Sequence, residues 1–386
     1  MDDSDLWAHD ENWAVLLTFL PSGWEESARR LGALRRCRKF ADAESLLRTL
    51  LIHLADGCSL RETVARAKAG NIASVSDVAL LKRLRSSGEW LRWLAAGLMQ
   101  RWVDRQPPAV FGDDRPIRVV DGSSIQEPGA TGSTWRIHYS IQLPSLQCDE
   151  VHVTSPSVGE SFKNFAVHPG DIFLGDRGYA HRAGIGHVVG EGGDVVVRTN
   201  LISIPFTHAD GTRLDLLEKL RTLRGTRIGD WIVFIRHNGE ILPGRVCALK
   251  KNKLATQRAR KKVLQESSRK GRQVRPETLE AAGYTFIFTT LPRTVAPSVV
   301  LELYRGRWQV ELAFKRLKSL LSLGHLKKLD PQSAQAWIHG KLMVAFLIEA
   351  LIVAGERFSP WGYPLPEELP KISLSVARNV VHAPPD

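Results

Sequence analysis

Residues 171–198 read DIFLGDRGYAHRAGIGHVVGEGGDVVVR, an apolar run, a segment of helical length and a second apolar run. The runs at 171–176 and 194–198 have the length and the β-branched content of buried strands. Between them, residues 181–189 carry apolar side chains at helical spacing and end at glycines. This part of the chain therefore predicts strand, helix and strand in succession.

Further apolar runs extend this pattern in both directions. Upstream, strands are predicted at 117–121, 134–141 and 150–154, with a short helix at 161–167. Downstream, strands are predicted at 231–235, 245–249 and 284–290, and the chain reads as helical from Ser298 onward. Three meandering strands followed by alternating helix and strand predict a mixed α/β fold, a mixed sheet flanked by helices.

The first part of the chain, residues 1–108, reads as helical. Apolar residues recur at three- and four-residue spacing in the ranges 43–54, 60–69, 78–84 and 90–99. Ser59, in a capping box with Glu62, and Ser76 are expected to start helices. Short helices with many cations suit a helix-turn-helix-like DNA reader, and a plain helical packing domain fits the same pattern.

The positive charge is concentrated in one segment. The 386 residues carry a net charge of +12, and residues 250–275 hold eleven basic residues and one acidic residue, 11 − 1 = +10. Such a run is typical of contact with a phosphate backbone, and a solvated flexible loop is the alternative. The candidates for phosphate contact within it are Lys250, Lys251, Arg260, Lys261 and Lys262.

Composition also argues against several classes of protein. The most apolar stretch, 342–354, is too short to cross a membrane and contains Glu349, and the acidic N-terminus lacks a secretion signal. The four cysteines are far apart, without a C-x-x-C pair, which argues against a zinc site and a disulfide framework. A reduced, cytosolic protein is expected.

Residues 303–321 are predicted to form one helix with two adjacent stripes. At about 100° per residue, an apolar stripe runs from Leu303 to Leu321. Beside it lies a polar stripe of Tyr304, Arg307, Glu311 and Lys318. The alternative is an amphipathic helix in which Arg307 and Glu311 form only a weak i, i+4 pair.

Two more carboxylates follow predicted strands. Asp121 ends the strand at 117–121, and Asp176 ends the strand at 171–176. Either could be a turn former that accepts local backbone hydrogen bonds. If the two strands are neighbours, a helix across their edge brings Glu311 to both aspartates, and three ionised carboxylates so close need divalent cations. Two Mg²⁺ ions about 4 Å apart would then support in-line phosphoryl transfer.

The spacing Tyr304-x2-Arg307-x3-Glu311-x6-Lys318 resembles the signature of bacterial cut-and-paste insertion-sequence transposases of the DDE type, with Asp121 and Asp176 as the first two acids. The resemblance implies a ribonuclease-H-like catalytic core, a β-rich insertion after strand five and an all-α N-terminal domain. The implied divisions are 1–108 (helical, DNA-binding), 109–200 with 283–330 (catalytic core), 201–282 (basic insertion) and 331–386 (C-terminal helical segment).

The same resemblance assigns roles to single residues. It implies that Asp121, Asp176 and Glu311 bind two Mg²⁺ ions, for which Mn²⁺ can substitute. Tyr304, Arg307 and Lys318 would hold phosphates, and Trp308 and Lys315 would touch DNA. Trp231 would stack on a flipped base, although a buried tryptophan is as compatible with its place on a strand. For Arg136 and His138, near the site on strand two, a core role is the better interpretation.

The resulting hypothesis is a transposase that hydrolyses DNA at the ends of its element and joins the 3′-hydroxyl to a target. Its expected partners are double-stranded DNA, as terminal repeats and target, and a second copy in a synaptic homodimer, in the bacterial cytoplasm at the nucleoid. The alternatives are a metal-dependent nuclease on the same core and a transposase-derived DNA-binding protein without catalysis. Intact Asp121, Asp176 and Glu311 argue against the latter.

Overall fold

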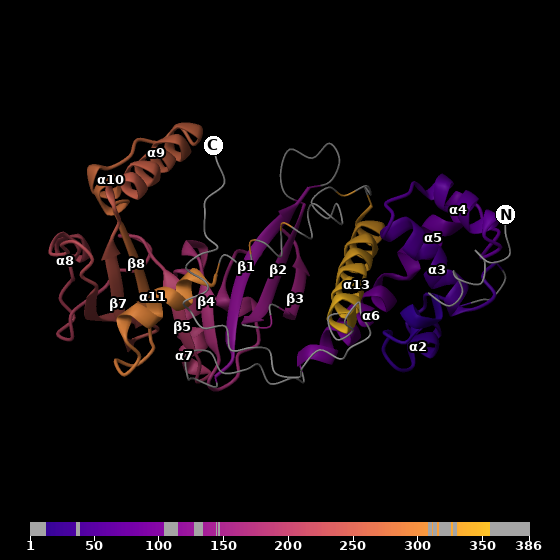
Figure 1. Ribbon diagram of the computed structural model, residues 1–386, viewed down its shortest axis with the longest axis horizontal. Coiled ribbons are helices and arrows are strands. Elements are labelled where there is room, and N and C mark those ends of the chain that lie inside the picture. Colours follow the sequence, from indigo (N-terminus) through magenta and orange to yellow (C-terminus); the bar gives the residue numbers. More distant parts are fainter. Residues whose placement is uncertain are drawn as a thin grey trace.

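One mixed eight-stranded sheet forms the centre of the protein (Figure 1). The computed structural model describes residues 13–35, 39–103, 115–126, 134–143, 145, 147–307, 311, 315, 326 and 330–355. The strand order is β3-β2-β1-β4-β5-β8-β7-β6. The strands are β1 (Ile117–Ile125), β2 (Trp135–Leu143), β3 (Cys148–Thr154), β4 (Ile172–Gly175), β5 (Asp194–Arg198), β6 (Gly229–His237), β7 (Glu240–Lys250) and β8 (Tyr284–Thr289).

The pairing of the strands confirms the mixed α/β prediction. β4 pairs in parallel with β1 and with β5, whereas all other pairs in the sheet are antiparallel. The chain crosses from β4 to β5 through α7 (Arg182–Gly190), the strand–helix–strand unit that the sequence predicts. The predicted helix at 161–167 is shorter in the structure, a single 3₁₀ turn, η1 (Phe162–Asn164).

Residues 201–282 extend this sheet and do not form a β-rich unit of their own. β7 pairs with β8, so β6 and β7 continue the sheet beyond β5. The rest of the segment contains α8 (Leu216–Arg221), α9 (Lys253–Arg269) and α10 (Pro276–Ala281), which together hold more residues than its two strands. The prediction of a β-rich insertion was wrong on this point, because pairing between distant strands leaves no local signal in the sequence.

The helices α2 (Trp24–Arg30), α3 (Ala43–Leu54), α4 (Leu60–Ala69), α5 (Asp77–Ser86) and α6 (Gly88–Val103) form the N-terminal part, as predicted. Ser59 and Ser76 are N-caps, each accepting a backbone hydrogen bond. The reciprocal capping box is at Asp42 and Ser45 and not at Ser59, because the Glu62 carboxylate pairs with Arg66 at 2.8 Å.

Helix α13 (Pro331–Gly355) lies beside α6, between the β3 edge of the sheet and the N-terminal helices (Figure 1). A side chain at Gly340 would collide with Leu54 of α3, which shows how closely these helices pack. The stretch Pro331–Ile352 is long and apolar enough to cross a membrane, so the prediction that this region is too short was wrong. Since 72% of its most apolar window is buried inside the protein, the burial matches that of a core helix.

Two apolar cores lie on opposite faces of the sheet, because neighbouring strand residues point in opposite directions. On β1, Val119 belongs to the core shared with α6 and α13, whereas Val120 belongs to the core shared with α7 and α8. Both valines are fully buried. Cys58, Cys148 and Cys247 are also buried, and no disulfide forms among the described residues.

The predicted helix at 303–321 is interrupted near its start. Helix α11 (Pro297–Arg305) ends at Arg305, and the amides of Gly306 and Arg307 donate to the carbonyls of Leu303 and Tyr304 in tight i→i−3 turns. A Cβ at Gly306 would lie 2.9 Å from the Leu143 side chain, so only glycine fits there. Tyr304 is thus on α11 and Arg307 beyond its end, so the prediction of one continuous helix was wrong.

Candidate active site

The two aspartates meet at one edge of the sheet. The parallel register of β1 and β4 pairs Val119 with Leu174, and each aspartate lies two residues further along its strand direction. Asp176 ends β4 as the N-cap of the 3₁₀ turn η2 (Arg177–Tyr179), where its Oδ1 accepts from the Gly178 amide at 2.7 Å. Asp121 accepts from the Gly122 amide at 2.9 Å. Both also satisfy local backbone amides, as a turn-forming aspartate does.

The charge on Asp121 is held in an unfavourable environment. Burial raises the pKa of Asp121 to about 6, and the nearby negative charge of Asp176 acts in the same direction. The Gly122 amide and the Arg307 guanidinium oppose this rise in pKa. An aspartate with such a pKa gains from any additional cation placed beside it.

Arg307 connects Asp121 to Glu311. One guanidinium nitrogen of Arg307 lies 3.9 Å from Asp121 Oδ2, and another donates to Glu311 Oε1. The Arg307 side chain is only 14% exposed, while Glu311 is 58% exposed. Tyr304 is half-buried, with its ring centre 5.9 Å from the Arg307 guanidinium carbon. The four groups Asp121, Glu311, Arg307 and Tyr304 are therefore brought to one place, as predicted.

A further acid, Glu160, lies at the same place and was not predicted. Its carboxylate contacts the backbones at Gly122 and Gly178, where an added Cβ would collide with it. Burial and the charge of Asp176 raise the pKa of Glu160. The sequence carries one indirect signal for such an approach, since a glycine follows each aspartate closely, in Asp121-Gly122 and Asp176-Arg177-Gly178.

Other predicted residues lie elsewhere. Trp231 is on the edge strand β6, four strands from β4 in the sheet order, or about 19 Å at ~4.8 Å per strand. Its ring packs over Gly229 against the second core, so the structure does not place it at the carboxylates. Lys315 is an exposed helical residue. Trp308 and Lys318 fall outside the described residues.

The basic run is helical and not a loop. Most of it forms α9, in which no residue is buried and whose N-cap is Asn252. Lys261 and Lys262 are exposed on this helix, and the Arg260 side chain, also exposed, donates to the Leu279 carbonyl at 3.1 Å. Figure 1 shows α9 and α10 projecting from the sheet at the end far from the N-terminal helices.

Lys250 and Lys251, which precede α9, differ in environment. Lys250 is exposed at the end of β7, whereas Lys251 is half-buried and donates to the Ala282 carbonyl at 2.8 Å. Burial lowers the pKa of Lys251 to about 8, and the charges of Arg198 and Arg177 lower it further. Since Arg177 directly follows Asp176, these cations lie next to the acidic site, an arrangement that the sequence did not suggest.

Other carboxylates near the sheet are already neutralised. Arg118, 4% exposed, pairs with Asp149 at 2.6 Å and Asp171 at 3.2 Å and also contacts Glu150. Arg136 donates to the Val158 carbonyl at 2.9 Å, and His138 contacts Thr154 at 3.0 Å. Burial lowers the pKa of His138 to about 4, so it is a neutral core residue, as the preferred interpretation has it.

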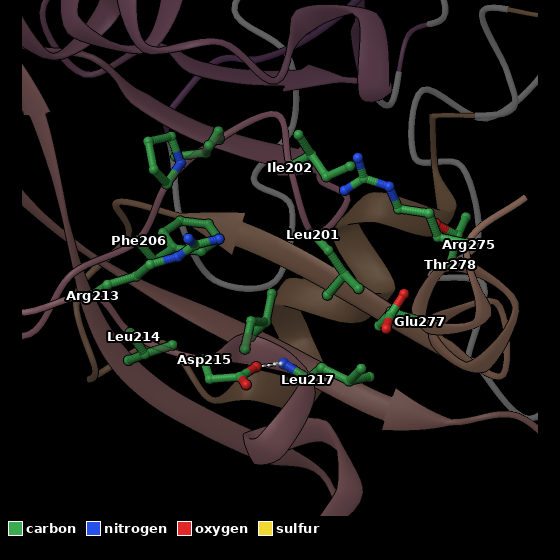
Figure 2. Close-up of a pocket in the computed structure, with 13 residues that line it drawn as sticks. Leu201, Ile202, Phe206, Arg213, Leu214, Asp215, Leu217, Arg275, Glu277 and Thr278 are labelled. Carbon is green, nitrogen blue, oxygen red and sulfur yellow. Dashed lines mark hydrogen bonds between the residues drawn. The ribbon is translucent and has the colours of Figure 1, made fainter.

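The cavity in Figure 2 has no comparable chemistry. It measures about 460 Å³ and lies between residues 201–217 and α10. Its one aspartate, Asp215, is the N-cap of α8, and Figure 2 shows it accepting from the Leu217 amide, at 2.9 Å. Apolar side chains such as Leu201 and Phe206 form much of the remaining wall. The cluster around Asp121 is therefore the better candidate for catalysis.

The donor set of that cluster suits a hard divalent cation. All its acids offer carboxylate oxygens, the ligands that Mg²⁺ and Mn²⁺ prefer, and the raised pKa of Asp121 indicates a deficit of positive charge. Within the described residues, no three Asp, Glu, His or Cys side chains are close enough to hold one ion together. Shared coordination would thus require these carboxylates to rotate toward the ion.

Comparison with known proteins adds an independent observation. Residues 149–347 match the family described as "Transposase DDE domain". The chain is 36% identical over 363 residues to the putative transposase InsL for insertion sequence element IS186A of Escherichia coli (strain K12), covering 92% of this chain and 97% of that protein. It is 36% identical over 364 residues, with the same coverage, to the transposase for insertion sequence element IS421 of Escherichia coli. The transposase for IS231B of Bacillus thuringiensis subsp. berliner is 22% identical over 368 residues, covering 85% of this chain and 76% of that protein.

Proposed function

Because the chain belongs to the DDE transposase family, we propose that it moves an insertion sequence by cut-and-paste transposition, with Asp121, Asp176 and Glu311 as its catalytic acids. Enzymes of this family cleave DNA and transfer strands with the help of divalent metal ions, on a ribonuclease-H-like core. The observation that carries the assignment of residues is the shared environment of Asp121. Its parallel neighbour β4 ends at Asp176, and Arg307 contacts both Asp121 and Glu311.

The three acids are proposed to hold two Mg²⁺ ions, with Mn²⁺ as a substitute. When bound, such ions lower the pKa of a water or a 3′-hydroxyl and stabilise the leaving oxygen of an in-line phosphoryl displacement. Asp121 and Asp176 are fixed by adjacent strands and by local backbone amides, so their positions are set before DNA arrives. Arg307 orients Glu311 and offsets part of the negative charge around Asp121.

The cations around these acids are suited to hold the DNA backbone. Tyr304 and Arg307 lie beside the carboxylates, and Arg177, Arg198 and Lys251 lie on the neighbouring surface. Lys315 and the exposed cations of α9 extend the positive surface, as Trp308 and Lys318 would extend the signature. Contacts of this kind position a phosphate backbone and carry no base specificity. Stacking of Trp231 on a base is not retained, because its ring packs on the second core.

The proposed partners are the terminal repeats of the element, target DNA and a second copy of the chain in a synaptic homodimer. The helices α2–α6 are the proposed reader of the repeats, and α9 with its neighbours the proposed second DNA contact. α13 packs against α6, α5 and α3, so in this division it would support the helical domain.

The test is Glu311→Gln assayed on DNA that carries the inverted repeats flanking the coding region. We expect binding to this DNA to stay within about twofold, and Mg²⁺-dependent cleavage to fall at least about 100-fold, the upper range for perturbed metal sites. Glu302→Gln on α11, which removes a carboxylate paired only with Arg305, is the matched control and should cleave normally. Cleavage that persists in Glu311→Gln would contradict the assignment. Cleaved ends that never join a supplied target would favour a nuclease.

A further inference from the structure

We infer that Glu160 is a fourth acidic ligand of this site, and that its carboxylate supports the divalent cation held by Asp121 and Asp176. This inference rests on the proposed function, since it concerns the same cation. Glu160 precedes η1, far in sequence from the signature residues and in a segment with no strand or helix pattern of its own. Its role follows from four observations on the surrounding residues.

The loop that carries Glu160 is fixed on three sides. The Val158 carbonyl accepts from Arg136 of β2 at 2.9 Å, and the Gly159 carbonyl accepts from the Asn164 amide group at 2.9 Å. The Glu160 carbonyl lies 3.1 Å from His181 Nε2, just ahead of α7. Three successive residues are therefore tied to different elements. The direction in which the Glu160 side chain leaves the backbone is thus set by the fold.

That direction takes the carboxylate between the two aspartate-bearing turns. A Cβ at Gly122 would lie 2.9 Å from Glu160 Oε1, and a Cβ at Gly178 would lie closer still to Oε2. The same added Cβ at Gly178 would be 3.1 Å from Asp176 Oδ1. One carboxylate oxygen therefore faces the backbone next to Asp121 and the other the backbone next to Asp176. Both glycines leave room that any side chain would fill.

The position of Glu160 is unfavourable without a cation. No hydrogen bond or ion pair to its carboxylate is found in the described part of the chain, although the positive charge of Arg136 is close enough to stabilise the ionised form. Asp176 raises the pKa of Glu160, and the charge of Glu160 in turn raises the pKa of Asp121. Mutual repulsion of this kind is normally relieved by protonation or by a bound cation.

The Tyr179 hydroxyl points to the same conclusion independently. Tyr179 is fully buried, and its hydroxyl has no hydrogen-bond partner in the structure. The charges that act on it most strongly are those of Asp121, Glu160 and Asp176, which together with burial raise the pKa of Tyr179. A buried, unpartnered polar group beside three acids indicates that a polar ligand belongs there.

The test measures Mn²⁺ affinity of the full-length protein without DNA, by isothermal titration and by the electron paramagnetic resonance signal of free Mn²⁺. Glu160→Gln keeps the shape of the side chain and removes its charge, and we expect Mn²⁺ affinity to fall about tenfold or more. Gly178→Ala displaces the carboxylate and should act in the same direction. Glu191→Gln, at an exposed carboxylate beyond α7, is the matched control and should bind as the parent does.

Asp176→Asn serves as the reference for the cation site itself. If it loses Mn²⁺ binding while Glu160→Gln and Gly178→Ala retain parental affinity, the role of Glu160 is refuted and the proposed function stands. If Asp176→Asn also retains parental affinity, the cation site is refuted. In metal-free buffer, Glu160→Gln should melt no lower than the parent, because one repulsive charge is gone. A lower melting temperature with unchanged Mn²⁺ affinity would show a purely structural role and overturn the inference.

Discussion

Acidification should weaken cation binding at an unusually high pH, because Asp121 must be ionised to bind a cation. The pKa of Asp121 is raised to about 6 by burial and by Asp176. With this pKa, the ionised fraction is roughly 0.9 at pH 7 and roughly 0.1 at pH 5, so apparent Mn²⁺ affinity should fall about tenfold between these values. An aspartate with an ordinary pKa of about 3.9 would stay more than roughly nine-tenths ionised over the same range.

The sign of the effect can be checked with two variants that act in opposite directions. Arg307→Gln removes a cation that lies 3.9 Å from Asp121 Oδ2 and lowers the pKa of Asp121, so the midpoint should move to higher pH. Glu160→Gln removes a negative charge that raises the same pKa, so the midpoint should move to lower pH.

The measurement is Mn²⁺ titration from pH 4.5 to 7.5, together with ¹³C NMR titration of the Asp121 carboxyl in metal-free protein. The NMR titration separates the ionisation of Asp121 from any loss of binding caused by other groups. A flat Mn²⁺ affinity between pH 7 and pH 5 would refute the reasoning, as would an Asp121 carboxyl that titrates near pH 4. So would an Arg307→Gln variant whose midpoint moves to lower pH.

Two further predictions concern regions away from the carboxylates. Neutralising exposed cations of the α9 region should weaken DNA binding for all sequences and flatten the plot of log K against log salt by about 0.9 per lost phosphate contact, checked by salt-dependent fluorescence anisotropy; an unchanged slope would assign α9 no contact with DNA. The cations to neutralise are Lys250, Arg258, Lys261 and Lys262, leaving Lys251 and Arg260 to their backbone hydrogen bonds. Arg118→Met should lower the free energy of unfolding by about 3–5 kcal/mol in urea titrations, because Asp149 and Asp171 stay buried without their partner. Arg92→Met, at an exposed pair with Glu89, should change it by less than about 1 kcal/mol, and equal losses would contradict the argument.

The sequence was sufficient where local patterns decide the structure. The bounds of α3, α4 and β5 match the prediction, because each combines a clear apolar period with a capping residue or a glycine boundary. The two aspartates were found because each ends an apolar strand, and the parallel pairing of β1 with β4 then brings them together. Arg307 and Glu311 were found from their spacing, which survives the end of α11.

The sequence was insufficient where contacts between distant residues decide the structure. Glu160 reaches the aspartates through hydrogen bonds from Arg136, Asn164 and His181, none of which has a spacing that marks it. The end of α11 depends on how closely Gly306 approaches Leu143. The helical state of the basic run is a different case, since Asn252 and the following helix-forming residues were available to read, but the density of charge suggested a loop.

The contrast between the two ends of β1 explains why this cluster of acids, and not another, is suited to bind a cation. At the first end, Arg118 neutralises Asp149, Glu150 and Asp171 with a single buried guanidinium, so these acids have no need of a metal. At the other end, Asp121 shares the guanidinium of Arg307 with Glu311, at 3.9 Å from its own Oδ2. Buried acids are normally matched by positive charge, as at the first end. The deficit beside Asp121 is therefore a charge that DNA, itself an anion, can only increase, and a divalent cation is the component that balances both.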